Sequence, residues 1–256
     1  MMLSEKNNLT IITIHKGSFY NLKKTLSSID SQIIKVSKHI VVANGINNFQ
    51  INCLKKKYRI FLLNKDSSIY NAMNLGLSEK SVRNNNFIFL NSGDKLSNKM
   101  VIYRLKNYLK LNICLVGKVE LKYKINKYLI KDKFFFKDNY FPHCGFISPP
   151  LNLPEYKRKL YMYDEKRLID ADSLWIKKII NLKKKKIKKL NFSISQHALS
   201  GVSSNPSFFS MKYYFSIKFF FFIKELVKFI LLKFLGYTNY YKLIYFYKYN
   251  IRTNND

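Results

Sequence analysis

Acidic side chains are scarce in this 256-residue chain, which holds 15 Asp and Glu against 46 Lys and Arg. A carboxylate that directly follows a predicted strand is therefore informative. Asp94 is such a residue, because it closes the polar segment 91–94 (NSGD) after the apolar run 87–90 (FIFL). One carboxylate, together with substrate phosphates, is enough to hold a hard divalent cation. The alternative is that Asp94 only completes a turn or caps a helix.

Two more polar segments stand directly after predicted strands. Residues 15–17 (HKG) follow the run at 9–14 (LTIITI), and residues 44–47 (NGIN) follow the run at 39–43 (HIVVA). Short β-branched runs that end in polar residues predict buried strands. No phosphate-binding loop of the form G-x-x-x-x-G-K-S/T occurs, and no G-x-G-x-x-G follows the first strand. P-loop hydrolysis and dinucleotide binding are therefore poorly supported.

The order of the elements indicates how these segments are positioned. Strands that alternate with helices predict an α/β fold with a mostly parallel sheet and helices on both faces. Ligands of such a sheet bind beyond the carboxyl ends of its strands, where the three polar segments stand. Ser67 or Ser68 can cap the third helix. In this first half, strands are predicted over residues 9–14, 39–43, 60–63 and 87–90, and helices over residues 21–32, 50–58, 69–77 and 98–109.

The second half of the chain is more mixed. A helix is predicted over residues 170–182, with Leu174, Trp175 and Ile179 on its apolar side. The lysine-rich run at 183–189 is typical of a solvated face. Strands are predicted over residues 113–120, 123–130, 141–148 and 190–194.

Residues 211–235 form a predicted amphipathic helix. Bulky apolar and basic residues on opposite sides suit an anionic membrane interface, and the alternative is a helix that packs on the domain or on a partner. No uninterrupted apolar stretch is long enough to predict a transmembrane helix. The apolar stripe consists of Phe219, Ile223, Leu226 and Ile230, and the opposite side carries Lys218, Lys224, Glu225 and Lys228.

The formal charge of +31 and the cysteine pattern limit the class of protein. Such a charge attracts polyanions, although an AT-rich coding bias also produces a lysine-rich chain. The basic residues are spread along the sequence without a recognised nucleic-acid motif, so a nucleic-acid binder is the weakest hypothesis. Cys53, Cys114 and Cys144 lack any C-x-x-C spacing, which predicts neither a disulfide framework nor a cysteine-based zinc site and fits a reducing cytosol. Residues 1–8 are polar and do not predict a signal peptide.

Several segments resemble, in the same order, those of bacterial family-2 glycosyltransferases, in the branch of small enzymes that make surface polysaccharides. Residues 66–76 (DSSIYNAMNLG) are similar to D-x-G-I-Y-D-A-M-N-K-G, and residues 87–94 are similar to Y-I-x-F-L-N-S-G-D, the branch's version of the DXD motif. Residues 163–172 (YDEKRLIDAD) resemble the approach to the catalytic-base aspartate. His143 lies where these enzymes often have H-Q, and residues 201–203 (GVS) are similar to G-G-V-S.

The resemblance implies a GT-A fold, a Rossmann-like nucleotide-binding mixed sheet with helices on both faces, over residues 1–205. A basic, aromatic helical tail over residues 206–256 would follow. The implied activity is inverting transfer of a sugar from a nucleotide-diphosphate sugar, a UDP-sugar in particular, to a saccharide or lipid-linked saccharide acceptor of surface-polysaccharide or lipopolysaccharide assembly. The enzyme would use Mg²⁺ or Mn²⁺ and lie in the cytoplasm, on the inner face of the membrane, with no specific nucleic-acid partner.

The resemblance also assigns roles to residues. Asp94 would hold the metal, which offsets the charge growing on the departing diphosphate. Asp172 would be the general base that takes the proton of the acceptor hydroxyl, and His143 and Trp175 would lie on the acceptor side. Binding of the nucleotide sugar is expected at Thr13, His15, Asn44, Asp66, Asn71, Asn74, Asn91, Ser92 and Gly93.

Alternatives stay open for two of the acidic residues. Asp170 competes with Asp172, but side chains two residues apart on a helix diverge by about 200°, so only one can face the site. Asp172 can also be a helix N-terminal carboxylate that interacts with the macrodipole. Asp66 can be only the cap of the helix beginning at Ile69.

The sequence also departs from the family pattern. Asn44 and Asn47 replace the two carboxylates of D-G-S-x-D, although an amide can still hydrogen-bond a base edge. Residues 15–17 replace T-x-N, Asn71 and Leu75 replace an Asp and a Lys, and Cys144 replaces the Gln after His143. These changes are compatible with a shifted donor. They are also compatible with a catalytically degenerate binding subunit of a membrane-associated assembly complex.

Overall fold

The computed structural model describes residues 8–66, 68–122, 129–131, 142–152, 155–166, 171–183, 186–198, 215 and 219–253. The chain divides into two compact units. The larger contains Met1–Leu121 and Ile130–Ala198, and the smaller contains Lys122–Leu129 and Leu199–Asp256. The predicted boundary between residues 205 and 206 lies outside the described residues, so the division at that point stays a prediction.

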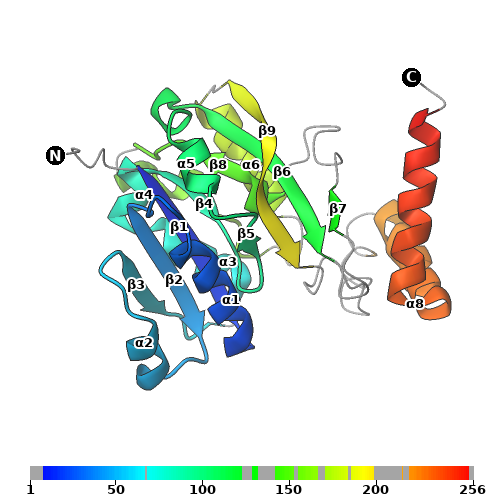
Figure 1. Ribbon diagram of the computed structural model, residues 1–256, viewed down its shortest axis with the longest axis horizontal. Helices are drawn as coiled ribbons and strands as arrows, with labels where there is room; N and C mark the ends of the chain where they lie inside the picture. The colour runs from blue at the N-terminus through cyan, green and yellow to red at the C-terminus, as the bar shows by residue number, and fades with distance from the viewer. Residues whose placement is uncertain are drawn as a thin grey trace. The chain divides into compact units, whose positions relative to one another are not determined.

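The larger unit is built on one mixed sheet (Figure 1), whose described strands are β1 (Leu9–Lys16), β2 (Lys38–Asn44), β3 (Arg59–Leu63), β4 (Asn86–Phe89), β5 (Lys95–Leu96), β6 (Cys114–Lys122), β7 (Leu129–Lys131), β8 (Phe146–Ser148) and β9 (Ile187–Ala198). Their order is β3-β2-β1-β4-β8-β6-β9-β5, and β7 pairs with β6. The strands β1 to β4 pair in parallel, whereas β4–β8, β6–β8 and β5–β9 are antiparallel. The antiparallel strands thus extend the parallel half of the sheet.

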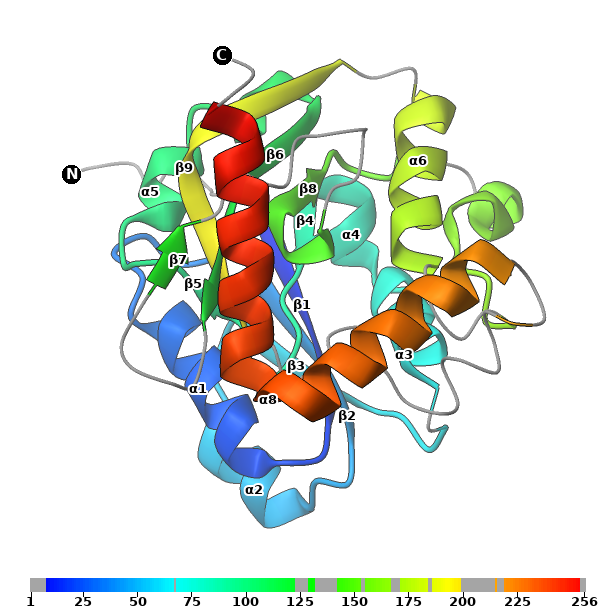
Figure 2. The ribbon, with the colours of Figure 1, turned by 90° about the vertical axis from the view of Figure 1, so that its right-hand side faces the viewer.

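Helices cover both faces of this sheet (Figure 2), namely α1 (Phe19–Asp30), α2 (Asn48–Leu54), α3 (Ile69–Leu77), α4 (Lys80–Asn84), α5 (Val101–Leu105) and α6 (Ala171–Lys183), with the 3-10 helices η1 (Leu109–Leu111), η3 (His143–Gly145) and η4 (Glu155–Tyr161). Side chains alternate across a strand, so Ile11 and Ile12 of β1 belong to different cores. Ile12 packs with α3 and α6, whereas Ile11 packs with α1 and α5. The predicted α/β fold, with helices on both faces of the sheet, is confirmed.

The helices and strands predicted from the sequence agree best with the observed ones in the parallel half of the sheet. The helix predicted over residues 69–77 is α3, and its N-cap is Ser68, whose hydroxyl accepts the Asn71 N–H. The helix predicted over residues 98–109 is shorter, because the chain changes to the 3-10 turn η1 after α5.

Two expectations for the second half are corrected. The strand predicted over residues 141–148 begins only at Phe146, because the turn η3 precedes it. The strand predicted over residues 190–194 extends over Ile187–Ala198, so β9 begins inside the lysine-rich run, whose described residues Lys186, Lys188 and Lys189 are exposed as expected. A longer β9 matters for function, because its last residues reach the site described below.

The smaller unit contains α8 (Phe219–Thr253), which is longer than the helix predicted over residues 211–235. Its backbone kinks at Gly236, where φ is 68°, a conformation that glycine adopts without steric cost. Phe220 and Phe234 are 79% and 85% exposed, so α8 presents large aromatic side chains. No helix among the described residues has the length and apolar character needed to cross a bilayer.

Candidate active site

The polar segment after β4 is a tight turn held by α1. Gly93 has a φ of 106°, which favours glycine. Its N–H donates to the Thr25 hydroxyl at 2.9 Å, and that hydroxyl donates to the Asp94 carbonyl at 2.7 Å. Thr25 is fully buried. A side chain of α1 that the sequence did not single out therefore sets the position of the segment.

Asp94 meets the end of the last strand of the sheet. The antiparallel pairing of β5 with β9 places Lys95 opposite Gln196, so the register brings Asp94 to His197. His197 Nδ1 lies 2.9 Å from Asp94 Oδ1, and the Asp94 side chain is only 3% exposed. Burial alone would lower the pKa of His197, but the Asp94 carboxylate and the Cys144 side chain raise it well above the ordinary value. Without a bound cation, the two side chains form an ion pair.

Cys144 completes a group of three candidate metal ligands. It lies in η3 and is fully buried. The Ser195 hydroxyl of β9 donates to its carbonyl at 2.6 Å. One ligand atom from each of Asp94, Cys144 and His197 lies within 4.8 Å of the others. Carboxylate, thiolate and imidazole are all metal ligands, so the residues present fit a bound cation.

A second chain of contacts links the predicted base to the same turn. Asp172, in the first turn of α6, places Oδ2 3.4 Å from His143 Nδ1, and His143 Nε2 lies 3.1 Å from Asn91 Nδ2. An amide nitrogen can only donate, so in the neutral imidazole Nε2 accepts and the ring proton on Nδ1 faces Asp172. Asp172, His143 and Asn91 thus form a chain of contacts, and Asn91 stands three residues before Asp94 in the sequence.

The electrostatics keep Asp172 ionised. Burial would raise the pKa of its carboxyl, but the contact with His143 and the Ser173 N–H, which donates to Oδ1 at 2.9 Å, lower the pKa below its ordinary value. The carboxylate is therefore deprotonated at neutral pH, as a general base must be before it accepts a proton.

Two buried polar atoms beside the turn have no partner within the part of the chain that the structure describes. They are His15 Nε2 and Asn91 Oδ1. His15 is otherwise engaged, because its Nδ1 lies 3.0 Å from the Ser92 hydroxyl. Burial lowers the pKa of His15, which favours the neutral ring. An unsatisfied buried polar group costs about 1–3 kcal/mol, so these atoms mark a place that a ligand or water can complete.

Two predicted donor-binding residues lie together beyond the ends of β2 and β3. The Asn44 amide donates to the Asp66 carbonyl at 3.1 Å, and Asp66 is exposed. The Asp66 carboxylate also accepts the Ser68 N–H at 2.9 Å, a local turn that leads into α3, whereas the N-cap of α3 is Ser68. This pair presents polar groups to solvent at the edge where nucleosides bind in such sheets.

The asparagines of α3 join two of the family-like segments. The Asn74 amide accepts the Tyr163 N–H at 2.7 Å and donates to the Tyr163 carbonyl at 3.1 Å. Asn74 and Asn71 also donate to the Glu165 carboxylate, at 2.7 and 3.2 Å. In this structure both side chains hold the chain leading to Asp172, and their predicted role in donor binding stays a prediction.

Comparison with known proteins rests on structure. No protein-family model and no curated protein matches the sequence. S. aureus TarS 1-349 in complex with UDP-GlcNAc matches with a TM-score of 0.60 and 14% identity, over 89% of this chain and 73% of that chain. Against another structure of TarS 1-349, this chain spans 60% of that chain's length.

Two further matches come from other glycosyltransferases. GalNAc-T7 with UDP, GalNAc and Mn²⁺ matches with a TM-score of 0.56 and 10% identity, over 83% of this chain and 47% of that chain. The mannosyltransferase PcManGT from Pyrobaculum calidifontis, in complex with GDP-Man and Mn²⁺, matches with a TM-score of 0.52 and 9% identity. The match covers 77% of this chain and 58% of that chain. This protein has the GT-A glycosyltransferase fold.

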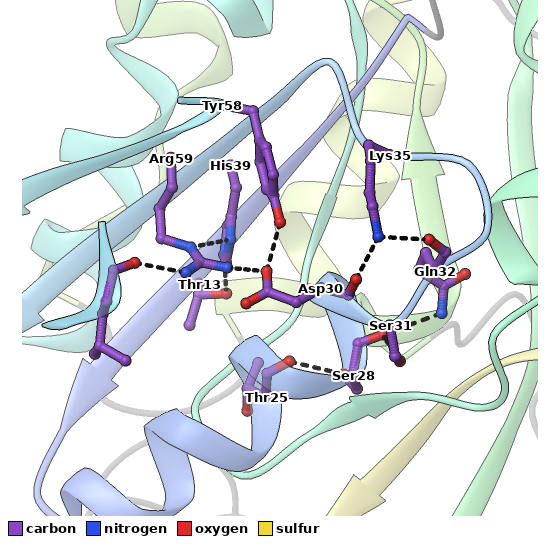
Figure 3. A network of polar contacts seen from close by, with 11 residues as sticks. Thr13, Thr25, Ser28, Asp30, Ser31, Gln32, Lys35, His39, Tyr58 and Arg59 are labelled. Atoms are coloured by element: carbon purple, nitrogen blue, oxygen red, sulfur yellow. Dashed lines mark hydrogen bonds and ion pairs between the residues drawn. The ribbon is translucent and has the colours of Figure 1, made fainter. Parts of the chain in front are cut away.

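Two predicted site residues of this GT-A domain lie in its interior. Thr13 is fully buried, with its hydroxyl 3.0 Å from His39 Nε2 (Figure 3). Trp175 is 3% exposed, stacks on Tyr163 and donates its indole N–H to the Tyr161 carbonyl at 2.8 Å. We therefore assign both to packing rather than to direct contact with donor or acceptor. Asp170 and the segment 201–203 lie outside the described residues.

Three residues of the GT-A site escaped the sequence analysis. They are Thr25, Cys144 as a possible ligand, and His197. Thr25 and His197 contact Asp94 across 69 and 103 residues of sequence. Cys144 lies within 4.8 Å of the ligand atoms of Asp94 and His197, and none of the three stands in a recognisable spacing with Asp94. A polar Q-H pair at the end of the last predicted strand is the only local signal for His197.

Proposed function

We propose that this protein transfers a sugar from a nucleotide-diphosphate donor to a hydroxyl group of a saccharide or lipid-linked saccharide, with inversion at the anomeric carbon. The observation that carries the proposal is the Asp172–His143–Asn91 chain, which brings a half-buried, ionised carboxylate to the turn that contains Asp94. The GT-A fold supports it, since structures that match this one hold UDP, UDP-GlcNAc and GDP-Man.

The leaving group would be handled at the turn after β4. A divalent cation there would act as a Lewis acid that offsets the charge on the departing diphosphate. Asp94 would hold it, together with His197 and Cys144. Mn²⁺ accompanies two of the matching structures, and Mg²⁺ and Mn²⁺ are the ions that the family resemblance implies. The unpartnered Asn91 carboxamide oxygen and His15 nitrogen are available to the donor or its water at the same edge.

Asp172 would supply the proton acceptor. As the acceptor oxygen bonds to the anomeric carbon, the bond from that carbon to the diphosphate oxygen breaks, and the hydroxyl proton moves to the Asp172 carboxylate. His143 positions that carboxylate by donating from Nδ1. Attack on the face opposite the leaving diphosphate inverts the anomeric configuration, and no covalent glycosyl-enzyme is required.

The proposal extends to the location of the protein. α8 combines exposed Phe219, Phe220 and Phe234 with lysines, an arrangement suited to an anionic lipid interface. We therefore propose a cytoplasmic enzyme that lies on the inner face of the membrane, where lipid-linked acceptors of surface-polysaccharide assembly are present. The boundary near residue 205 would separate catalysis from this attachment.

A two-part experiment tests the function. Thermal unfolding is measured with UDP, GDP and their sugars, each with and without divalent cations; a ligand present at 100 times its Kd adds about 2.7 kcal/mol of stability. Transfer is then followed as release of the nucleoside diphosphate together with product formed on lipid-linked acceptors. Cation-dependent binding that Asp94→Ala abolishes, followed by transfer, supports the proposal. Binding without transfer to any acceptor favours the binding-subunit alternative, and neither binding nor transfer contradicts the proposed function.

A further inference from the structure

The candidate cation site contains a ligand that oxygen-preferring ions do not favour. Cys144 and Cys114 are both fully buried, and a buried cysteine is often only a small core residue. Cys144 differs because its sulfur lies within 4.8 Å of a ligand atom of Asp94 and of a ligand atom of His197. Both cysteines also border apolar clusters, Cys114 the one that contains Phe87 and Trp175 and Cys144 the one that contains Ile147 and Ile194, so the difference lies in the two neighbouring ligand side chains.

The three ligands are held in place before any ion binds. Asp94 is fixed by the turn that Thr25 anchors, and His197 by the pairing of β9 with β5. Cys144 is fixed twice: Ser195 bonds its carbonyl, and a Cβ on the next residue, Gly145, would lie 2.6 Å from Val119. The turn η3 therefore packs directly on β6, which leaves little freedom for the thiol to move away.

The ligand set decides which ion fits. Mg²⁺ requires near-octahedral oxygen ligands, and Mn²⁺ binds more weakly than Zn²⁺ to a given nitrogen or sulfur site. Carboxylate, thiolate and imidazole are the ligands of Zn²⁺, and zinc sites that act on substrates have three protein ligands and one open position. The number and the chemistry of the ligands agree with that arrangement.

We propose that Asp94, Cys144 and His197 form a zinc-selective site, with the fourth position left for a diphosphate oxygen of the donor. Only that fourth ligand rests on the proposed function. Replacement of the family's glutamine by Cys144 would thus change the ion that the enzyme uses, from an oxygen-preferring to a sulfur-binding one.

Cobalt spectroscopy of the full-length chain tests the site without reference to activity. The protein carries no histidine tag and has the exposed Cys53 replaced by serine. Co²⁺ is added as a coloured substitute for Zn²⁺. We expect one ion per chain, a thiolate-to-cobalt charge-transfer band and visible bands of tetrahedral intensity, all lost on addition of Zn²⁺. Cys144→Ser should remove the charge-transfer band and weaken Zn²⁺ binding by at least about 10²-fold, since even partners outside the ligand shell can account for that much. Cys114→Ser is the matched buried control and should change neither.

The outcomes separate this inference from the proposed function. Co²⁺ bound without a charge-transfer band, or Mn²⁺ bound more tightly than Zn²⁺ and equally by wild type and Cys144→Ser, would overturn the zinc proposal and leave glycosyl transfer untouched. The wild-type spectrum decides the matter even if Cys144→Ser does not fold. Failure of the proposed function shows elsewhere, as absence of nucleotide binding and of transfer whichever ion is supplied.

Discussion

Two histidine-centred clusters of buried and half-buried polar side chains lie in the GT-A domain, and they differ in how far their hydrogen bonds are satisfied. We call the first the strand network, which consists of Thr13, Asp30, His39, Tyr58 and Arg59 (Figure 3). We call the second the site cluster, which consists of His15, Asn91, Asp94, His143, Cys144, Asp172 and His197.

In the strand network, both nitrogens of the central histidine have partners. Arg59 can only donate, so His39 Nδ1 accepts its Nε–H at 3.0 Å and Nε2 donates to Thr13 at 3.0 Å. Arg59 also donates to the Asp30 carboxylate, which accepts the Tyr58 hydroxyl at 2.5 Å. Burial and the Asp30 carboxylate raise the pKa of Tyr58 to about 12. These contacts fasten the end of α1 to β2 and β3.

In the site cluster, the hydrogen-bonding capacity is only partly used. Among the described residues, His15 Nε2 and Asn91 Oδ1 lack partners, and the ligand atoms of Asp94, Cys144 and His197 converge on one point. The contrast shows why burial of a polar residue does not by itself indicate function. A network that is satisfied within the chain stabilises the fold, whereas an incompletely satisfied one leaves polar atoms that a ligand or water can complete.

The largest expected effect is on catalysis, from a change confined to the site cluster. Asp172→Asn keeps the shape of the side chain but cannot accept a proton, so transfer should fall by roughly 10²–10⁴-fold, while the donor still binds. Product formation with a matched donor and acceptor is the measurement. Asp164→Asn, at an exposed carboxylate nearby, is the control and should retain activity. Equal transfer by wild type and Asp172→Asn would remove Asp172 from the mechanism.

The complementary change in the strand network should affect stability instead. Arg59→Leu removes the donor to His39 and Asp30 and the bond to the Leu54 carbonyl at 2.7 Å. We expect the free energy of unfolding to fall by about 3 kcal/mol, with the Kd of the folded protein for the donor unchanged. Urea unfolding and calorimetric titration measure the two quantities. A weakened donor affinity at full stability would break the distinction between the clusters.

The pH dependence of stability should have opposite sign for His39 of the strand network and His197 of the site cluster. Burial, then Arg59, lowers the pKa of His39 well below 6.5, so below pH 6.5 the unfolded chain binds the extra proton and stability falls as the pH falls. The raised pKa of His197 has the reverse effect. Its stabilisation is complete below pH 6.5 and is lost as the pH rises through the folded-state pKa.

Urea unfolding at a series of pH values in metal-free buffer can separate these contributions. Each histidine changes the slope by at most about 1.4 kcal/mol per pH unit. His39→Gln should reduce the change in the free energy of unfolding with pH below pH 6.5. His197→Gln should reduce that change above pH 6.5. If both variants altered stability in the same pH range, the assignment of the two pKa shifts would be wrong.

The smallest effect concerns α8, whose removal should leave both clusters unchanged. A chain ending at Pro206 should keep donor binding and the pH profile but lose its affinity for anionic liposomes. Replacing Lys224 or Lys228 with glutamine should weaken liposome binding by about 1 kcal/mol each, as measured by vesicle sedimentation. Undiminished binding of the shortened chain would place the membrane contact in the GT-A domain.

The parallel half of the fold could be predicted, because its strands and helices carry local periodic patterns and its turns carry motifs. The same motifs singled out Asp94, His143 and Asp172, which the structure places in the site cluster, and their roles stay predictions. His197 and Thr25 could not be found in this way, because their contacts depend on strand register and helix packing rather than on spacing. Trp175 and Thr13 were assigned from their places in family-like segments, and only the packing shows that they face the interior.

The pairing of β5 with β9 has a consequence for biosynthesis. His197 reaches Asp94 across 103 residues of sequence, so a nascent chain that has emerged only through β8 already contains Asp94 and Cys144 but not their third partner. Because chains fold progressively during synthesis and distant pairings form late, the cation centre is expected to be among the last parts to mature. A chain truncated before β9 should fold its parallel half and yet be unable to bind the cation proposed for this site.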